Sequence, residues 1–257
     1  MNEQPEKINN AAEIFRNGHL CEKDGQFDEA RKAYELGLEF SPAQHPWHYR
    51  LGCILMKMDQ PAEAELSFRK ALDLAPGTEA YLANLGVCLD RQGRRDDAVR
   101  AYRRAIHQGA TNPVAYHNLG AIYAEEGRVV EAISSFESAI ALEPDAEGYH
   151  NLGLVHFSGN EFVRALSCFE RAVEHDSNFS MGHYFAGLCL MKNGVYEDAC
   201  QRFEQARSLN ENLMRIPFHV GVCLQAGALR TGSTEIGNRF ELFSRRRAGS
   251  LPAGFNL

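Results

Sequence analysis

Small and aromatic residues return along this chain at a nearly constant interval, with polar residues between them. Seven key glycines stand 34, 34, 34, 33, 34 and 34 residues apart, at Gly18, Gly52, Gly86, Gly120, Gly153, Gly187 and Gly221. Twelve residues after each of the first six comes an alanine, at Ala30, Ala64, Ala98, Ala132, Ala165 and Ala199. Four residues further comes a ring, at Tyr34, Phe68, Tyr102, Phe136, Phe169 and Phe203. Residues four apart share a helix face, so the pattern predicts helix pairs that bury this face by stacking on their neighbours.

Residue types that tolerate a left-handed backbone mark the middle of each repeat. They stand seven residues after the first six key glycines, at Gly25, Asp59, Gly93, Gly127, Asn160 and Gly194. Such residues commonly follow the last turn of a helix. Pro42, Pro76 and Pro144 should stop the second helix of three repeats, because proline cannot continue a helix ladder. The sequence therefore predicts a turn within each repeat and a break after several of them.

The unit of about 34 residues resembles the tetratricopeptide repeat (TPR) over almost the whole chain. The resemblance implies an all-α fold: a right-handed α-solenoid of six full helix pairs, a seventh partial repeat and a C-terminal capping helix. We expect residues 1–10 to be a polar lead-in, residues 11–229 to form the solenoid, and residues 230–257 to hold the capping helix and a mobile tail. The seventh first helix should span about 217–226, and the capping helix about 233–247.

The first helices line the concave surface in proteins of this family, and their sequence suggests what that surface binds. Two residues before three consecutive key glycines stand Asn84, Asn118 and Asn151, and Arg50 occupies this site one repeat earlier. An asparagine amide can both donate and accept, so a row of them can bond the backbone of an extended peptide. The row is similar to the asparagine ladder in the repeat domain of O-linked N-acetylglucosamine transferase. Alternatively, asparagine simply fits a common repeat sequence at this site.

Other positions of the same stripe carry aromatic and basic residues. Tyr49, His117, His150 and Tyr184 stand three residues before key glycines, and Lys57 and Arg91 stand five after. Such a surface suits a peptide with apolar anchors and some acidic residues. Some of these rings can instead be buried between repeats, and the two imidazoles can make the surface pH-sensitive or share a metal.

Composition limits the kinds of partner and the cellular location that we expect for the protein. The formal charge of −7 argues against non-specific nucleic-acid binding. No run of about 18 apolar residues predicts a membrane span, and no signal peptide is recognised, so a cytoplasmic location is expected. The seven cysteines include no C-x-x-C pair, and Cys88, Cys189 and Cys223 share one repeat position, which indicates core packing rather than metal binding. Arg94, Arg100 and their neighbours in the third repeat are expected to form local charge pairs on a solvated face.

No motif for phosphate binding, metalloprotease or serine hydrolase chemistry occurs, so no enzyme activity, cofactor or metal is expected. The sequence predicts a scaffold that binds a peptide segment of a partner protein in its concave groove. Two alternatives stay open: a self-assembling scaffold, similar to bacterial TPR scaffold proteins, and a targeting module of a separate enzyme such as a glycosyltransferase.

Overall fold

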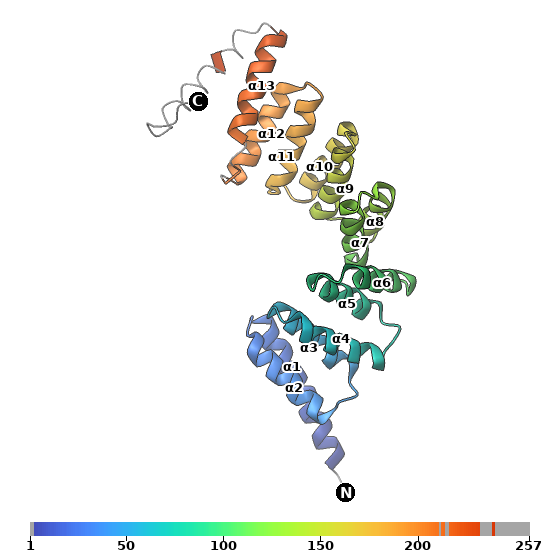
Figure 1. Cartoon of the computed structure of the whole chain (residues 1–257). Helices are drawn as coiled ribbons and strands as arrows, with labels where there is room; N and C mark the ends of the chain where they lie inside the picture. The colour runs from blue at the N-terminus through green and yellow to red at the C-terminus, as the bar shows by residue number, and fades with distance from the viewer. Residues whose placement is uncertain (1–2, 211, 214–215, 232–237, 240–257) are drawn as a thin grey trace, which may run out of the picture. The chain divides into compact units, whose positions relative to one another are not determined.

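The computed structural model describes residues 3–210, 212–213, 216–231 and 238–239, and every regular element within these ranges is an α-helix (Figure 1). The expected all-α class is therefore confirmed. Contacts divide the chain into two compact units, Met1–Ile122 and Tyr123–Leu257, which are described separately. The first unit contains α1 (Glu3–Lys23), α2 (Phe27–Phe40), α3 (His45–Lys57), α4 (Pro61–Leu74), α5 (Glu79–Arg91), α6 (Arg95–His107) and most of α7 (Val114–Glu125). The second contains α8 (Val129–Leu142), α9 (Ala146–Ser158), α10 (Phe162–His175), α11 (Ser180–Lys192), α12 (Tyr196–Leu209) and α13 (Ile216–Thr231).

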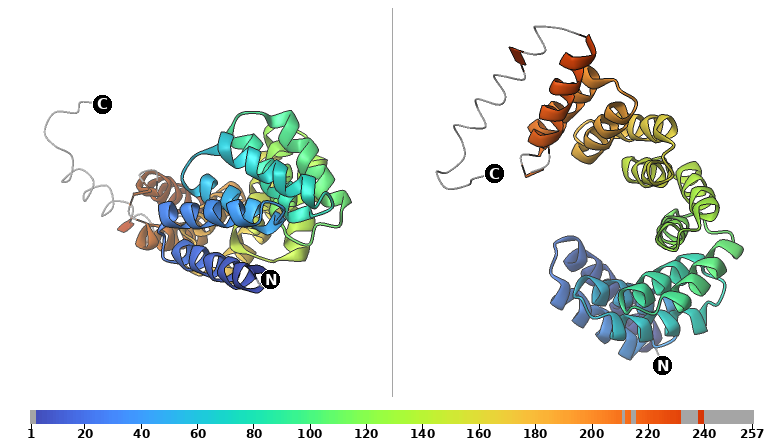
Figure 2. Two further views of the ribbon diagram at one scale, coloured as in Figure 1. Left: turned by 90° about the horizontal axis from the view of Figure 1, so that it is seen from below. Right: turned by 45° about the horizontal axis from the view of Figure 1, so that its top comes forward.

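Consecutive helices pack in pairs, as in a TPR solenoid (Figures 1 and 2). In the first unit α1 packs on α2, α3 on α4 and α5 on α6, and the second helices α2 and α4 also contact the next first helices, α3 and α5. The second unit repeats this arrangement with α9 on α10 and α11 on α12. Six predicted turn residues have a positive φ, including the non-glycine residues Asp59 at 57° and Asn160 at 59°. The turns inside the repeats are thus where the sequence predicted them.

The repeated small and aromatic residues form the contact within each helix pair. A Cβ added to Gly86 would lie 2.4 Å from the ring of Tyr102, and one added to Gly153 would lie 2.7 Å from Phe169. The ring therefore occupies the space that a larger residue would need. All six repeat rings and their preceding alanines are buried. This close approach is why the period specifies the backbone so strongly.

The seventh first helix, α13, is longer than the predicted span of about 217–226. Its buried residues Ile216, Val220, Cys223 and Leu224 pack against α12. The predicted capping helix at 233–247 and the tail lie outside the described residues, apart from residues 238–239. At the other end, α1 begins at Glu3, within the segment expected to be a lead-in.

The described helices include none that is both long and apolar enough to cross a membrane.

Candidate functional site

The first helices of neighbouring repeats lie side by side in both units. In the first unit α3 contacts α5 as well as its own partner α4, and in the second unit α9 contacts α11. The residues two or three before, and one or five after, each key glycine lie on these helices. We call this surface the first-helix face. Every residue that the sequence proposed for peptide binding stands at one of these positions, although not all of them reach the surface.

Tyr49 and Asn84 meet directly on this face, across the contact between α3 and α5. Nδ2 of Asn84 donates to the hydroxyl of Tyr49 at 3.0 Å and to the carbonyl oxygen of Ala80, one turn earlier, at 2.9 Å. The Tyr49 ring stacks on Tyr81 with centroids 4.5 Å apart, and Nδ1 of His45 lies 2.7 Å from the Tyr81 hydroxyl. Both N–H groups of Asn84 are therefore used within the protein. Among the described residues its Oδ1 has no partner, so this side chain offers an acceptor only.

The other two asparagines keep more of their hydrogen-bonding capacity. Nδ2 of Asn118 donates to the carbonyl oxygen of Val114 at 2.8 Å, and among the described residues its amide makes no other hydrogen bond. Asn151, in the second unit, makes none within the described part of the chain. Both side chains are half-buried, as is His117. Because Asn118 and Asn151 belong to different units, a continuous row of three remains a prediction.

Arg50 and Lys57 converge on a carboxylate that the sequence did not single out. Nζ of Lys57 lies 3.0 Å from Oε1 of Glu22, and a guanidinium nitrogen of Arg50 lies 3.4 Å from Oε2. The hydroxyl of Tyr34 also donates to Oε2, at 3.3 Å. Burial by itself would raise the pKa of Glu22, but the hydrogen bond and charge of Lys57, with the charge of Arg50, lower it below its usual value. Two cations share one anion, so this part of the face keeps a net charge of about +1.

A sequence signal could have found Glu22. It stands 35 residues before Lys57, one period plus one residue, and Tyr49 stands 35 before Asn84. Arg91 follows the same spacing, because its guanidinium donates to the carbonyl oxygen of Met56 at 3.1 Å, 35 residues earlier. Arg91 thus links the ends of α3 and α5.

In the second unit the first-helix face is mainly aromatic. The hydroxyl of Tyr184 lies 3.1 Å from Nε2 of His219, which joins α11 to α13. The Tyr184 ring contacts Phe185 and Phe203 at centroid distances of 5.4 and 5.9 Å. Tyr184 and Phe185 are half-buried, and Phe203 is fully buried. The ring of Tyr184 is therefore partly covered by rings of its own helix and of α12.

His150 lies beneath this face. It is 9% exposed, and its ring is 5.2–5.5 Å from the rings of Phe169, Phe179 and Phe185. Burial lowers the pKa of His150 to about 4, because no anion compensates the charged form. This arrangement matches the alternative that some rings of the stripe are buried between repeats. Within the described residues no three His, Cys, Asp or Glu side chains form a group that could hold a metal ion.

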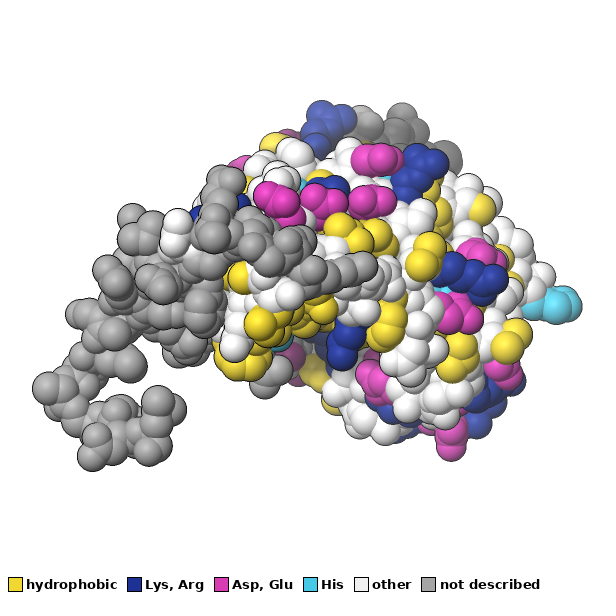
Figure 3. Space-filling model, turned by 90° about the horizontal axis from the view of Figure 1, so that it is seen from above, with side chains coloured by type: hydrophobic (Ala, Val, Ile, Leu, Met, Phe, Trp, Pro, Cys, Tyr) yellow, Lys and Arg dark blue, Asp and Glu magenta, His cyan; other side chains and the backbone are white. Residues whose placement is uncertain are grey.

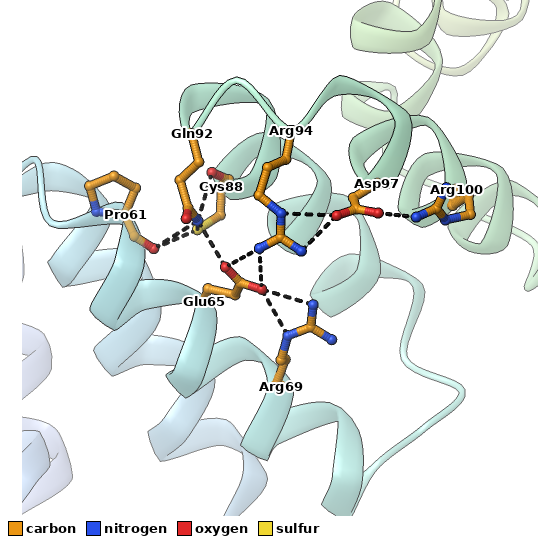
Figure 4. Close-up of polar contacts among 8 residues, drawn as sticks. All are labelled: Pro61, Glu65, Arg69, Cys88, Gln92, Arg94, Asp97 and Arg100. Atoms are coloured by element: carbon orange, nitrogen blue, oxygen red, sulfur yellow. Dashed lines mark hydrogen bonds and ion pairs between the residues drawn. The ribbon is translucent and has the colours of Figure 1, made fainter.

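The arginines of the third repeat are largely engaged in local ion pairs (Figure 4). Glu65 on α4 accepts from Arg69 at 2.8 Å and from Arg94 at 2.9 Å. Asp97 accepts from Arg94 at 2.6 Å and also from Arg100. The expected charge pairs are therefore present. On the face drawn in Figure 3, acidic and basic side chains are likewise interspersed, in line with the modest net charge.

Helix pairs, repeated glycine–ring contacts and side-by-side first helices define a helical-repeat protein. Models of the tetratricopeptide repeat match residues 9–44, 49–113, 89–147 and 146–179. The chain therefore belongs to the tetratricopeptide repeat family.

Solved structures of low sequence identity share the fold. The structure of the APC/C hetero-tetramer Cut9–Hcn1 matches with a TM-score of 0.69 and 16% identity, over 83% of this chain and 43% of that chain. YrrB, described as a TPR protein with an unusual peptide-binding site, matches with a TM-score of 0.60 and 19% identity, over 73% and 97%. MamA from Desulfovibrio magneticus RS-1, residues 41 to the end, matches with a TM-score of 0.58 and 18% identity, over 66% and 96%.

A search of curated proteins gave no match. TPR repeats are typical of protein–protein interaction scaffolds, and the fold is usually non-catalytic.

Proposed function

We propose that this chain is a scaffold that binds an extended segment of a partner protein along its first-helix face. The observation that carries the proposal is the state of the asparagine amides. In Asn84 and Asn118, Nδ2 bonds the carbonyl four residues earlier on the same helix. This bond fixes the amide plane, and each Oδ1 is left without a partner among the described residues. A fixed acceptor is suited to the N–H of a passing peptide backbone.

The neighbouring side chains suit particular side chains of such a segment. The pair Arg50 and Lys57 keeps a net positive charge around Glu22, which favours an acidic residue of the partner. Tyr184 and Phe185 are half-buried rings in contact with each other, and an aromatic cluster of this kind suits an apolar anchor of the partner. A segment with acidic and apolar residues and an extended backbone fits these features.

Peptides for the test come from a random linear library displayed on phage and selected on the whole chain. The selected peptides are titrated by calorimetry into wild type and into a triple variant with Asn84, Asn118 and Asn151 changed to Ala. Each lost hydrogen bond should weaken binding by about 0.5–1.5 kcal/mol, so the triple change weakens it by roughly ten- to a thousand-fold if the terms add. Because Asn84 offers only an acceptor, its single change should lie at the lower end.

The matched control changes two exposed asparagines outside the face, Asn178 and Asn193, to Ala. Their loss should leave affinity unchanged, and circular dichroism confirms that each variant is folded. Equal affinity of wild type and the folded triple variant would rule out the asparagine contacts. If no peptide is selected and light scattering shows a particle size that grows with protein concentration, the result supports the alternative of a self-assembling scaffold over peptide binding.

A further inference from the structure

Two thiols face each other in the core between α12 and α13. Cys200 is 3% exposed and Cys223 is 1% exposed, and both belong to one apolar cluster. Sγ of Cys200 lies 3.9 Å from the carbonyl oxygen of Val220, which is one turn before Cys223 on α13. The two thiol groups are also close enough for each to shift the pKa of the other. The geometry therefore brings together two sulfur atoms from separate helices.

The thiol pair borders a small cavity. Cys200 and Cys223 line it together with Tyr196, Leu224 and Arg239, and its volume is about 10 Å³. That is close to the smallest space that admits one water-sized molecule. The guanidinium of Arg239 lies 4.0 Å from a carboxylate oxygen of Glu197, which is also on the lining. Hydrogen peroxide, with two oxygen atoms, is the smallest neutral peroxide and the oxidant whose size comes nearest to that of this cavity.

The two sulfur atoms differ in acidity. The interaction with Cys223 and the charge of Arg239 lower the pKa of Cys200, against the effect of burial. The pKa of Cys223 is raised by the same interaction and by burial. The positive charge of Arg239 acts on Cys200, so Cys200 is the thiol that we expect to ionise first.

We propose that Cys200 and Cys223 are a redox-active pair, which hydrogen peroxide oxidises to a disulfide between α12 and α13. The thiolate of Cys200 attacks one peroxide oxygen, so an S–O bond forms, the O–O bond breaks and hydroxide leaves. The sulfur of Cys223 then attacks the sulfenic acid of Cys200, the S–S bond forms, and the S–O bond breaks. The leaving oxygen departs as water with the proton of Cys223. Two thiols lose two electrons, and one peroxide becomes two waters.

The disulfide would fix the last first helix of the described chain. His219 on α13 contacts Tyr184 on α11, so pinning α13 to α12 also holds this end of the first-helix face in place. This inference stands apart from the proposed peptide binding, because it depends only on the two thiols and their surroundings.

The test exposes the folded, reduced chain to one equivalent of hydrogen peroxide and then blocks free thiols with N-ethylmaleimide. Mass spectrometry of the digest should show a Cys200–Cys223 linked peptide with two hydrogens fewer, and dithiothreitol should reverse it. A bridge that closes a loop of this length should raise the melting temperature by roughly 5–10 °C. In Cys223→Ala the oxidation should stop at a sulfenic acid on Cys200, which dimedone traps.

The matched control is the second thiol pair of the same unit, Cys168 and Cys189. Burial raises the pKa of Cys168 to about 11 and of Cys189 to about 12, so neither is a ready thiolate. Cys189→Ala should therefore leave the Cys200–Cys223 linkage unchanged. The proposal fails if the linked peptide is absent from oxidised wild type, or if it forms only in denaturant. It also fails if Cys168 and Cys189 link as fast.

Discussion

Replacing Gly37 with alanine tests how the first two repeats pack together. Gly37 stands where the later repeats have an alanine, at Ala71, Ala105, Ala139, Ala172 and Ala206. It lies within α2, and alanine favours a helix over glycine by about 1 kcal/mol. Helix propensity alone therefore predicts that Gly37→Ala stabilises the protein.

The structure predicts the opposite, because Trp47 fills the space that alanine needs. A Cβ on Gly37 would lie 1.1 Å from Cζ3 of Trp47, where ordinary contact begins near 3.4 Å, so the ring has to move by about 2 Å. Trp47 is 7% exposed, and its ring lies 5.2 Å from that of Phe15. Overpacking costs about 1–3 kcal/mol, and full expulsion of a large ring forfeits roughly 4–6 kcal/mol. After the gain in propensity, the net loss is about 0–2 kcal/mol if the ring is accommodated and about 3–5 kcal/mol if it is expelled, and the displacement of about 2 Å favours the larger loss.

Urea unfolding followed by circular dichroism measures this loss. Trp47 is the one tryptophan of the chain, so its fluorescence reports its burial, and its emission should shift to longer wavelength in Gly37→Ala. In a Trp47→Leu background the smaller side chain leaves room, so Gly37→Ala should then cost much less. Equal or greater stability of Gly37→Ala, with unchanged emission, would refute the reasoning.

Three further outcomes follow from single residues. Burial lowers the pKa of His150 from 6.5 to about 4, so its contribution to stability is full above pH 6.5 and is lost as pH falls towards 4. The loss should reach about 3 kcal/mol, and urea unfolding at pH 7 and pH 4 should show a smaller difference in His150→Leu. Asp59→Gly should raise stability by about 0.5 kcal/mol in thermal melts, because φ is 57° there, and a lowered melting point would contradict this. Cys189 should react slowly with a thiol reagent in native protein, because burial raises its pKa to about 12, and rapid labelling would contradict its core position.

The backbone could be predicted from the sequence because one short-range rule repeats along it. Five key glycines lie against the ring sixteen residues later, namely Gly18, Gly52, Gly86, Gly153 and Gly187. Each turn within a repeat needs a residue that tolerates positive φ. Both constraints act between residues of the same repeat, so they recur in the sequence once per period and can be recognised there. Gly37 was visible as an exception, but its reason lies in Trp47, ten residues further on and outside the repeated pattern. Exceptions of this kind depend on side-chain volume, which a periodic pattern does not encode.

The candidate site was harder to predict, because its contacts run between repeats. Grouping residues at the same place in each repeat put Tyr49, His150 and Tyr184 together as one aromatic stripe. The structure separates them: Tyr49 makes polar contacts across α3 and α5, whereas His150 is buried among phenylalanine rings. Burial depends on which bulky residues the neighbouring helices supply, and His150 meets Phe179 and Phe185 from the following repeat. The sequence of a single repeat therefore does not indicate which of its rings the neighbouring repeats will bury.

The spacing of the polar contacts explains the difference between the asparagines. Side chains on adjacent first helices meet at a separation of 35 residues, as in Tyr49 with Asn84 and Tyr184 with His219. A residue thus faces its neighbour one place further along the repeat, and the contacts run diagonally across the face. The residue 35 before Asn118 is Ala83, which has no polar group, so Asn118 bonds only its own helix. For Asn84 and Asn118, the residue 35 places earlier therefore decides whether the amide has a partner across the repeats.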